Sequence, residues 1–148
     1  MAAARTGNTQ YAALPYRIGG DGLQILLITS RDSGRWIIPK GWPIAGLSPS
    51  QSAAREALEE AGVTGRTSDA SIGCYPYDKR LSGDAVRTCE VEVFALEVTE
   101  ERDAWPEQHQ RRRQWLSVDD AAAQVDEAEL GVMIREWAKR RAPAKPRR

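Results

Sequence analysis

The sequence predicts an α/β fold in which a mixed β-sheet lies between α-helices. Apolar runs of strand length alternate along the chain with segments of helical periodicity, and this order permits helices on both faces of one sheet. The chain has 148 residues, of which 41% are hydrophobic and 28% are charged. These values fit a single globular domain around one core and exclude a wholly disordered chain.

Six segments have the pattern of β-strands. They are residues 11–18, 23–29, 36–38, 72–77, 88–98 and 114–118. Residues 19–22 are glycine-rich and predict a hairpin between the first two strands, because glycine adopts positive φ without steric cost. The run 23–29 is almost continuously aliphatic, so we expect it near the middle of the sheet with both faces buried.

A helix is predicted between Ser48 and Gly62. Ser48 can cap its first turn, Pro49 suits the first helical position, and Gln51 can complete a capping box. Gly62 favours the end of the helix. The predicted buried face consists of Ala54, Ala57, Leu58 and Ala61, at helical spacing.

Two more helices are predicted in the last third of the chain. An alanine-rich run follows Asp119 and Asp120. Residues 127–141 carry an apolar stripe, formed by Leu130, Met133, Ile134 and Trp137, that we expect to face the core.

The predicted domain covers residues 11–141, between a flexible leader at 1–10 and a basic flexible tail at 142–148. The leader lacks the apolar run of a signal peptide, and no segment has the length of a membrane span, so we expect a cytoplasmic protein without a membrane partner. Twenty-one basic and 21 acidic residues cancel, and no groove-reading element supports nucleic acid as a partner. The sequence does not indicate an oligomeric state.

Glu56, Glu59 and Glu60 lie within about a quarter of the helical circumference, on the side opposite the predicted buried face. Like charges at this spacing repel one another, and one neighbouring cation, Arg55, cannot neutralise three carboxylates. Hard cations such as Mg²⁺ or Mn²⁺ would do so. The alternative is a solvated acidic helix face.

The segment from Gly41 to Val63 closely resembles the Nudix box. It keeps the spacing of the family pattern: Gly41, five residues, position 47, seven residues, Arg55-Glu56, then Glu59-Glu60 and a final Gly62. The resemblance extends through 11–137 in element order, and local matches at 35–41 and 111–115 are similar to the diphosphoinositol polyphosphate phosphohydrolase branch. It implies the Nudix fold, a mixed sheet in an α/β/α sandwich.

This resemblance implies a metal-dependent hydrolase of a diphosphate linkage, acting on an inositol pyrophosphate or a dinucleoside polyphosphate. Glu56 and Glu60 would be the main Mg²⁺ or Mn²⁺ ligands, Glu59 would assist, and the Lys40 carbonyl would complete the sphere. Glu56, Glu59 and Arg55 are the predicted catalytic residues, with Arg55 orienting a glutamate. Glu56 or a nearby carboxylate would accept the proton from the attacking water.

The same resemblance implies a set of residues that bind the small phosphorylated substrate. They are Arg17, Ser30, Arg31, Lys40, Gly41 and Arg112. Arginine suits this role because its donors match phosphate oxygens and its charge persists at working pH. Lys79 and Arg80 are looser candidates, and Trp42 is the best candidate for stacking on a base.

Two positions depart from the family pattern. Leu47 stands where the box has its first glutamate, and Gln114 stands where the branch has a glutamate before the tryptophan. The role of the missing glutamate near Trp115 is then either absent in this chain or supplied by Glu90, Glu92 or Glu107. These departures favour an alternative function, a catalytically weak Nudix-fold module that binds a ligand or regulates a partner.

Overall fold

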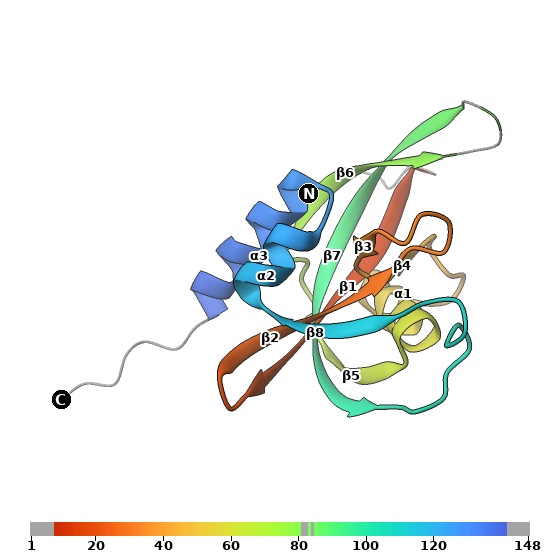
Figure 1. The fold of residues 1–148 in the computed structure, drawn as a ribbon. Helices are drawn as coiled ribbons and strands as arrows, with labels where there is room; N and C mark the ends of the chain where they lie inside the picture. The colour runs from red at the N-terminus through yellow and green to blue at the C-terminus, as the bar shows by residue number, and fades with distance from the viewer. Residues whose placement is uncertain (1–7, 81–82, 84, 142–148) are drawn as a thin grey trace.

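The computed structural model describes residues 8–80, 83 and 85–141. Its elements are, in order, β1 (Thr9–Gly19), β2 (Gly22–Thr29), β3 (Trp36–Ile37), β4 (Lys40–Gly41), α1 (Pro49–Glu56), the π-helical turn η1 (Ala57–Ala61), β5 (Val63–Thr67), β6 (Gly73–Arg80), β7 (Val86–Glu101), β8 (Arg113–Ser117), α2 (Val118–Gln124) and α3 (Ala128–Arg141) (Figure 1).

The strands of these described residues form one mixed sheet, as predicted. Its main path is β3-β2-β1-β7-β5, with β4 also pairing with β1, β6 with β7, and β8 with β2. β1 and β7 run parallel at its centre, and the other pairs are antiparallel. The hairpin between β1 and β2 is confirmed, with Gly19 opposite Gly22. β2 has neighbours on both sides, and 25–28 are fully buried.

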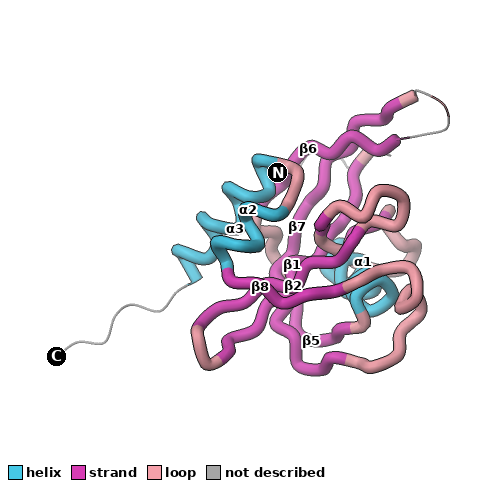
Figure 2. Tube along the Cα trace, in the orientation of Figure 1, coloured by secondary structure: helices cyan, strands magenta, loops and turns pink. Residues whose placement is uncertain are grey.

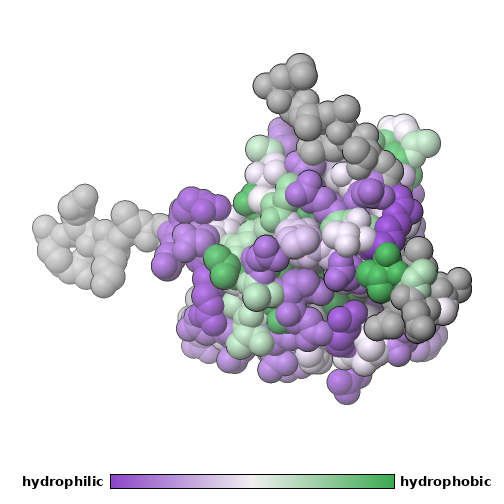
Figure 3. Space-filling model, turned by 90° about the horizontal axis from the view of Figure 1, so that it is seen from above, coloured by the Kyte–Doolittle hydropathy of each residue, from purple (hydrophilic) through white to green (hydrophobic). Residues whose placement is uncertain are grey.

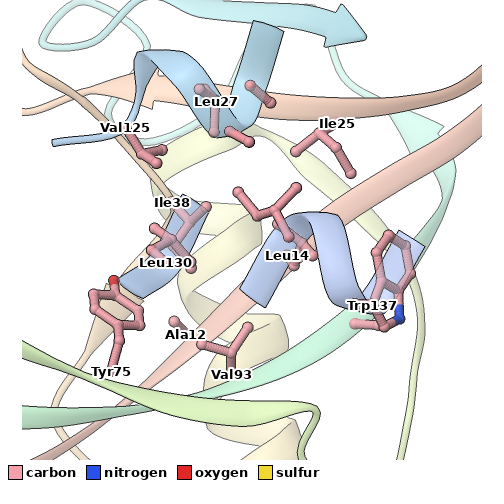
Figure 4. Close-up of a cluster of buried hydrophobic side chains, with 14 of the residues drawn as sticks. Ala12, Leu14, Ile25, Leu27, Ile38, Tyr75, Val93, Val125, Leu130 and Trp137 are labelled. Carbon is pink, nitrogen blue, oxygen red and sulfur yellow. The ribbon is translucent and has the colours of Figure 1, made fainter. Parts of the chain in front are cut away.

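Helices cover both faces of the sheet, which confirms the predicted sandwich. α2 and α3 lie on one side and α1 on the other (Figures 1 and 2). The first core contains Leu14, Leu27 and Val93 from the sheet with Leu130 and Trp137 from α3 (Figure 4). The second core packs alanines of α1 and η1 against the opposite face.

The start of the chain and the short strands differ from the predictions. β1 begins at Thr9, and Thr9 and Gln10 are buried instead of belonging to a flexible leader, because β7 is long enough to pair with both of them. β4 and β5 were not predicted, since neither carries a strand-length apolar run. The predicted tail at 142–148 and residues 1–7 lie outside the described residues.

The first helix buries a different face from the one predicted. Ala57 and Ala61 are fully buried as expected, but Ala53 and Glu60 are buried in place of Ala54 and Leu58. Alanines at four positions do not fix the rotation of a helix, because each has the same small apolar side chain. The change to π-helical geometry at Ala57 also ends the 100° periodicity on which the prediction relied.

The surface seen from above is mainly hydrophilic, with apolar side chains interspersed (Figure 3). Among the described residues, no helix combines the length and the apolar character needed to cross a membrane. Cys74 and Cys89 are both free thiols.

Candidate functional site

The turn η1 buries one of the three glutamates. Ser48 caps α1 through the predicted capping box, and the helix changes to π geometry before Gly62 ends it in the left-handed region, at φ 70°. Glu60 is only 6% exposed, and its Oε1 accepts a 3.3 Å hydrogen bond from the Lys40 backbone N–H. The indole N–H of Trp105 donates to the Glu60 carbonyl at 3.1 Å. Single π-helical turns of this kind are often found at functional sites.

Gly41 gives the Glu56 carboxylate its position against the backbone of β4. A Cβ atom built on Gly41 would lie 2.9 Å from Glu56 Oε1 and closer still to the rest of that carboxylate. The close approach of strand and carboxylate therefore requires glycine. This contact explains in physical terms why the first position of the predicted box is a glycine.

The carboxyls of Glu56 and Glu60 lie close enough to shift each other's pKa. Burial raises the pKa of Glu60 to about 8, against the opposing effect of the Arg111 charge, and the neighbouring Glu56 carboxyl raises it further. Burial also raises the pKa of Glu56, to which the charges of Glu59 and Glu107 add. The pair therefore holds a proton near neutral pH that a divalent cation would have to displace.

Arg111 is the cation that faces this carboxyl pair. Its side chain is only 7% exposed and lies 3.7 Å from Glu60 Oε1 and 2.7 Å from Glu107 Oε1. A third contact, 3.1 Å long, goes from Nη1 to the Thr29 carbonyl. These contacts hold one guanidinium between two carboxylates and the end of β2.

A pocket of about 230 Å³ opens beside Glu60 and Arg111. It is lined by Gln10, Ser30, Arg31, Asp32, Ile37, Lys40, Glu60, Tyr77 and Arg111. Three of these side chains are cationic and match phosphate oxygens, while the carboxylates match a divalent cation. The pocket thus joins the two kinds of group that a metal-bridged diphosphate needs.

The loop after β2 contributes a compact polar corner to this pocket. Ser30 is buried, its hydroxyl lies 2.8 Å from that of Ser33, and it accepts a bond from the Arg35 N–H. Asp32 is nearly fully exposed, and its slight burial tends to raise the pKa of the carboxyl. Hydrogen bonds from the backbone of Asp32 itself and of Ser33 have the larger combined effect, so the pKa of Asp32 is lowered. Arg31 reaches Gln110 at 3.3 Å.

The structure brings some predicted substrate-binding residues together and leaves others apart. Ser30, Arg31 and Lys40 line the pocket, whereas Gly41 is not one of its lining residues and lies against the Glu56 carboxylate. Arg17 lies five residues beyond Ala12 on β1, roughly 17 Å along the strand, where it bonds Gln24 and lies over Trp115. Arg112 is exposed and lies over Trp36.

The looser candidates Lys79 and Arg80 belong to β6, and their side chains are not among those that the structure describes. Trp42 lies under Arg87, with 4.8 Å between guanidinium and ring centroid, and does not line the pocket.

Arg55 and Leu47 meet on the far side of α1. Both line a second pocket of about 320 Å³, together with Ala54 and Leu58. Arg55 is exposed, and within the described part of the chain its side chain has no ion pair or hydrogen bond. The departure at position 47 thus removes a carboxylate from the neighbourhood of this arginine.

Some of the oxygen atoms in this site are suitable ligands for a hard divalent cation. Glu56 and Glu60 provide paired carboxylate oxygens, and the Gly41 backbone leaves room for them. Glu59 stays half-buried, and its carbonyl accepts a bond from the Glu107 N–H. Within 8–80, 83 and 85–141, no three acidic, histidine or cysteine side chains already converge in a metal-binding arrangement.

Glu107 stands out among the carboxylates considered in place of the missing one at position 114. It bonds Arg111, and its charge contributes to the raised pKa of Glu56. Glu92 is buried beside Tyr11 in the sheet, and Glu90 is exposed next to Thr9. Gln114 is exposed on β8 and does not line the pocket.

Sequence reasoning missed five residues that line the pocket, namely Gln10, Asp32, Ile37, Tyr77 and Arg111. The basic cluster 111–113 was recognised in the sequence, but its three members are all arginines. No alternation of apolar residues around them shows which of the three side chains faces the pocket. Gln10 and Tyr77 carried no local signal, because their place depends on the pairing of β1, β7 and β6.

Comparisons with known proteins agree with this geometry. A family model described as NUDIX domain matches residues 9–137. The chain is 34% identical over 102 residues to "Nudix hydrolase 12, mitochondrial" of Arabidopsis thaliana, a match covering 67% of this chain and 50% of that protein. It is 31% identical over 112 residues to diphosphoinositol polyphosphate phosphohydrolase 3-alpha of Mus musculus, covering 74% and 64%.

The matches span from about half to under two thirds of these curated relatives. Among solved structures, Ap4A hydrolase of C. elegans superimposes with a TM-score of 0.66 at 21% identity, covering 93% of this chain and all of that one. A NUDIX hydrolase from Nitrosomonas europaea gives a TM-score of 0.67, also at 21% identity, and covers 90% of both chains. These structural likenesses establish the shared fold.

Proposed function

The chain belongs to the Nudix family, and from this premise we propose that it is a metal-dependent pyrophosphohydrolase. It hydrolyses a diphosphate linkage in a small anionic substrate, an inositol pyrophosphate or a dinucleoside polyphosphate. The names of the mouse relative and of the C. elegans structure include both of these substrate classes. Water attacks a phosphorus atom, and the anhydride P–O bond to the leaving phosphate breaks.

The observation that carries this proposal is the carboxyl pair of Glu56 and Glu60 beside a cation-lined pocket. Glu60 is buried and Glu56 is half-buried, so both carboxyls are costly to ionise, and their raised pKa values are typical of functional groups. Arg31, Lys40 and Arg111 line the same pocket, where a polyphosphate would need positive charge.

Each group then has a proposed task. Glu56 and Glu60 would hold Mg²⁺ or Mn²⁺, assisted by Glu59 and the Lys40 carbonyl. A bound divalent ion would lower the pKa of the attacking water and neutralise the charge that develops on the phosphate oxygens in the transition state. The three cations and the Ser30 hydroxyl orient the phosphate oxygens. Glu56 or Glu107 accepts the proton of the attacking water.

Phosphate release tests the proposal directly. The native chain, Glu60→Gln and the control Glu100→Gln, an exposed carboxylate paired with Arg102, are assayed with Mg²⁺ or Mn²⁺ against diadenosine polyphosphates, inositol pyrophosphates, nucleoside triphosphates and nucleotide sugars. We expect Glu60→Gln to lose at least about 100-fold in rate while the control keeps full activity. Equal activity of Glu60→Gln and the native chain would remove the assigned site.

A second candidate function is a catalytically weak module that binds a phosphorylated ligand. Arg55, left without a carboxylate beside Leu47, favours it. Under this reading, the native chain binds diadenosine tetraphosphate but turns it over at a barely measurable rate, and Leu47→Glu raises hydrolysis. Brisk turnover by the native chain eliminates this candidate.

A cytoplasmic location remains part of the proposal. Relatives carry names with mitochondrial and chloroplastic locations. Imaging of the full-length protein with a tag at its C-terminus distinguishes these compartments.

A further inference from the structure

The segment 102–113, which leads from β7 into β8, lies against the C-terminal end of η1 (Figure 1). The last four carbonyl groups of a helix have no partner inside the helix. In this turn each of them accepts a hydrogen bond from the 102–113 segment. Glu59 O is bonded by the Glu107 N–H at 3.1 Å, Glu60 O by the Trp105 indole N–H at 3.1 Å, Ala61 O by Arg113 Nη1 at 2.8 Å, and Gly62 O by the Arg102 N–H at 2.8 Å.

Trp105 and Arg113 hold each other in place on this turn. The Arg113 guanidinium lies over the Trp105 ring, 3.9 Å from its centroid, and donates a second bond to the Arg102 carbonyl at 2.6 Å. Its positive charge lies at the C-terminal end of the turn, where the backbone carbonyls carry partial negative charge. The ring itself packs on Gly62, because a Cβ atom there would lie 2.6 Å from it. The indole N–H is therefore fixed in front of the Glu60 carbonyl.

Glu60 is consequently held at both of its ends. The Lys40 backbone N–H bonds its carboxylate at 3.3 Å, and the Arg111 guanidinium, also from the 102–113 segment, lies 3.7 Å from the same oxygen. Trp105 bonds its carbonyl. The carbonyl and the side chain share one Cα atom, so a rotation of the backbone at the end of η1 would also displace the carboxylate. Groups that orient a ligand from outside the metal sphere tune the affinity of a metal site.

We infer that Trp105 is a positioning residue, supported by Arg113, that fixes the direction in which Glu60 presents its carboxylate to a divalent cation. This inference rests on the proposed function, in which Glu60 holds that cation. Trp105 is not among the residues that line the pocket, so it acts through the Glu60 backbone and touches neither substrate nor cation. Its contribution should therefore appear in the affinity for the cation and not in the binding of the phosphates.

Trp105→Phe removes the indole N–H and keeps an aromatic ring, and Trp115→Phe is its matched control. Both tryptophans are half-buried, and each has an arginine over its ring, at 3.9 Å for Trp105 and 4.1 Å for Trp115. Each also donates one bond, but the acceptor of Trp115 is the Glu101 carboxylate, at 3.2 Å, which also contacts Arg113 at 3.4 Å. The control therefore shows whether loosening the neighbouring network is by itself enough.

Cation binding is measured without substrate, at a temperature where circular dichroism shows each variant to be fully folded. Calorimetry gives the dissociation constant of Mg²⁺, and the EPR signal of the free ion gives that of Mn²⁺. Trp105→Phe should weaken binding by about 3- to 10-fold, the value of one hydrogen bond, and Trp115→Phe should leave it within about twofold. Equal weakening by the two variants, or no weakening by Trp105→Phe, overturns the inference. Binding that Glu60→Gln leaves unchanged also overturns it, because the ion then lies elsewhere.

Kinetics separate positioning from a structural role. For diadenosine tetraphosphate, Trp105→Phe should raise the Mg²⁺ concentration of half-maximal rate by about 3- to 10-fold, while KM at saturating Mg²⁺ stays within about twofold of the native value. Excess Mg²⁺ should restore most of kcat, because ion binding returns the carboxylate to its place. A structural role alone would lower the melting temperature without changing the Mg²⁺ dependence of the folded protein, and that result overturns the inference.

Failure of the inference and failure of the proposed function give different results. If the native chain binds Mg²⁺ through Glu60 but hydrolyses none of the substrates, the proposed function fails, and the binding comparison of Trp105→Phe with Trp115→Phe still decides the inference. If the native chain hydrolyses a substrate and the two variants bind Mg²⁺ alike, the inference alone fails. A native chain that binds neither ion overturns the inference, and the phosphate-release assay then decides the proposed function.

Discussion

Arg111 and Arg112 are neighbours in the chain, but their side chains lie in opposite environments. Arg111 is buried between Glu60 and Glu107, whereas Arg112 is exposed over Trp36. We expect Arg111→Met to destabilise the protein by about 3 kcal/mol, because it leaves two carboxylates without their buried partner. It should also raise KM, since it removes a donor from the pocket. Urea denaturation and steady-state kinetics measure both effects.

Arg112→Met is the matched control for this change. It removes the same charge one position away, from a solvent-exposed side chain, and should cost under about 1 kcal/mol. Its KM tests the sequence-based prediction that Arg112 binds substrate. If Arg112→Met raised KM as much as Arg111→Met, the pocket would have to extend to Trp36, and the assignment of Arg111 as the main phosphate donor would be wrong.

The sequence predicted the type of residue at this site better than the individual side chain. Glu56, Glu60, Lys40, Ser30 and Arg31 come from segments whose spacing or resemblance is local, and the structure places them together. The choice of Arg112 over Arg111 depended on the direction in which the chain enters β8, which the sequence does not encode locally. The sequence could not show for a related reason that Arg17 lies away from this pocket, because distance along a strand is visible only once its pairing is known.

At the scale of elements, the contact between β4 and α1 depends on a single missing Cβ atom. Gly41→Ala should displace the Glu56 carboxylate, since the added atom would lie within 3 Å of it. A misplacement of about 1 Å can cost roughly 100-fold in rate, so we expect a loss of that order with little change in melting temperature. Gly20→Ala, which meets nothing within 4 Å, is the control and should keep native kinetics.

Gly62 ends η1 with a left-handed backbone conformation. Gly62 and Gly83 have nearly the same backbone angle, φ 70° and 69°. Alanine at either position incurs left-handed strain of about 1–2 kcal/mol. At Gly62 the new methyl group would also lie 2.6 Å from the Trp105 ring and 2.8 Å from Arg113.

Gly62→Ala should therefore cost about 1–3 kcal/mol more than Gly83→Ala, the usual penalty for overpacking. The difference between the two free energies of unfolding, from urea denaturation, isolates the packing of Trp105 on this turn. Equal destabilisation by the two variants would contradict the packing and leave only the strain.

Local chemistry predicted the boundaries of this helix but not its interior. The capping box at Ser48 and the stop at Gly62 are both present, because each depends on residues within one turn. The π-helical turn was not predictable from the 3.6-residue period, and with it Glu60 turns inward to Lys40 and Arg111. The helix-wheel expectation that all three glutamates face away from the core was thus wrong for Glu60.

At the scale of the whole molecule, the layered fold follows from the order of its elements, but the central pairing does not. The resemblance to the Nudix family implied a sandwich of helices on a mixed sheet, the order of strand and helix patterns permitted it, and the sheet is mixed. The parallel pairing of β1 with β7 joins segments about 80 residues apart, with Thr9 opposite Glu90, and only the closed fold determines it. This pairing also brings Gln10 to the pocket.

The carboxyl pair should make the stability of the whole protein depend on pH. In the unfolded chain the pKa of Glu60 is the ordinary value of 4.5 for a glutamate, and in the folded protein burial raises this pKa to about 8. Between these values the folded state binds more protons than the unfolded state, so the free energy of unfolding falls as pH rises. The contribution of Glu60 is complete below about 4.5 and lost above about 8. The metal-free protein should therefore be less stable at a pH of about 8 than at about 6, and Glu60→Gln should flatten this slope in urea denaturation.

A divalent cation should act in the opposite direction, because it binds the ionised pair and releases its proton. The rise in melting temperature caused by Mg²⁺ should grow from a pH of about 6 to about 8, as the competing proton is lost, and it should be small at both values in Glu60→Gln. Glu100→Gln, on the exposed pair with Arg102, should respond as the native chain does. Differential scanning calorimetry with and without Mg²⁺ measures these shifts. A Mg²⁺ effect that is independent of pH, or that survives in Glu60→Gln, would show that the cation binds away from this carboxyl pair.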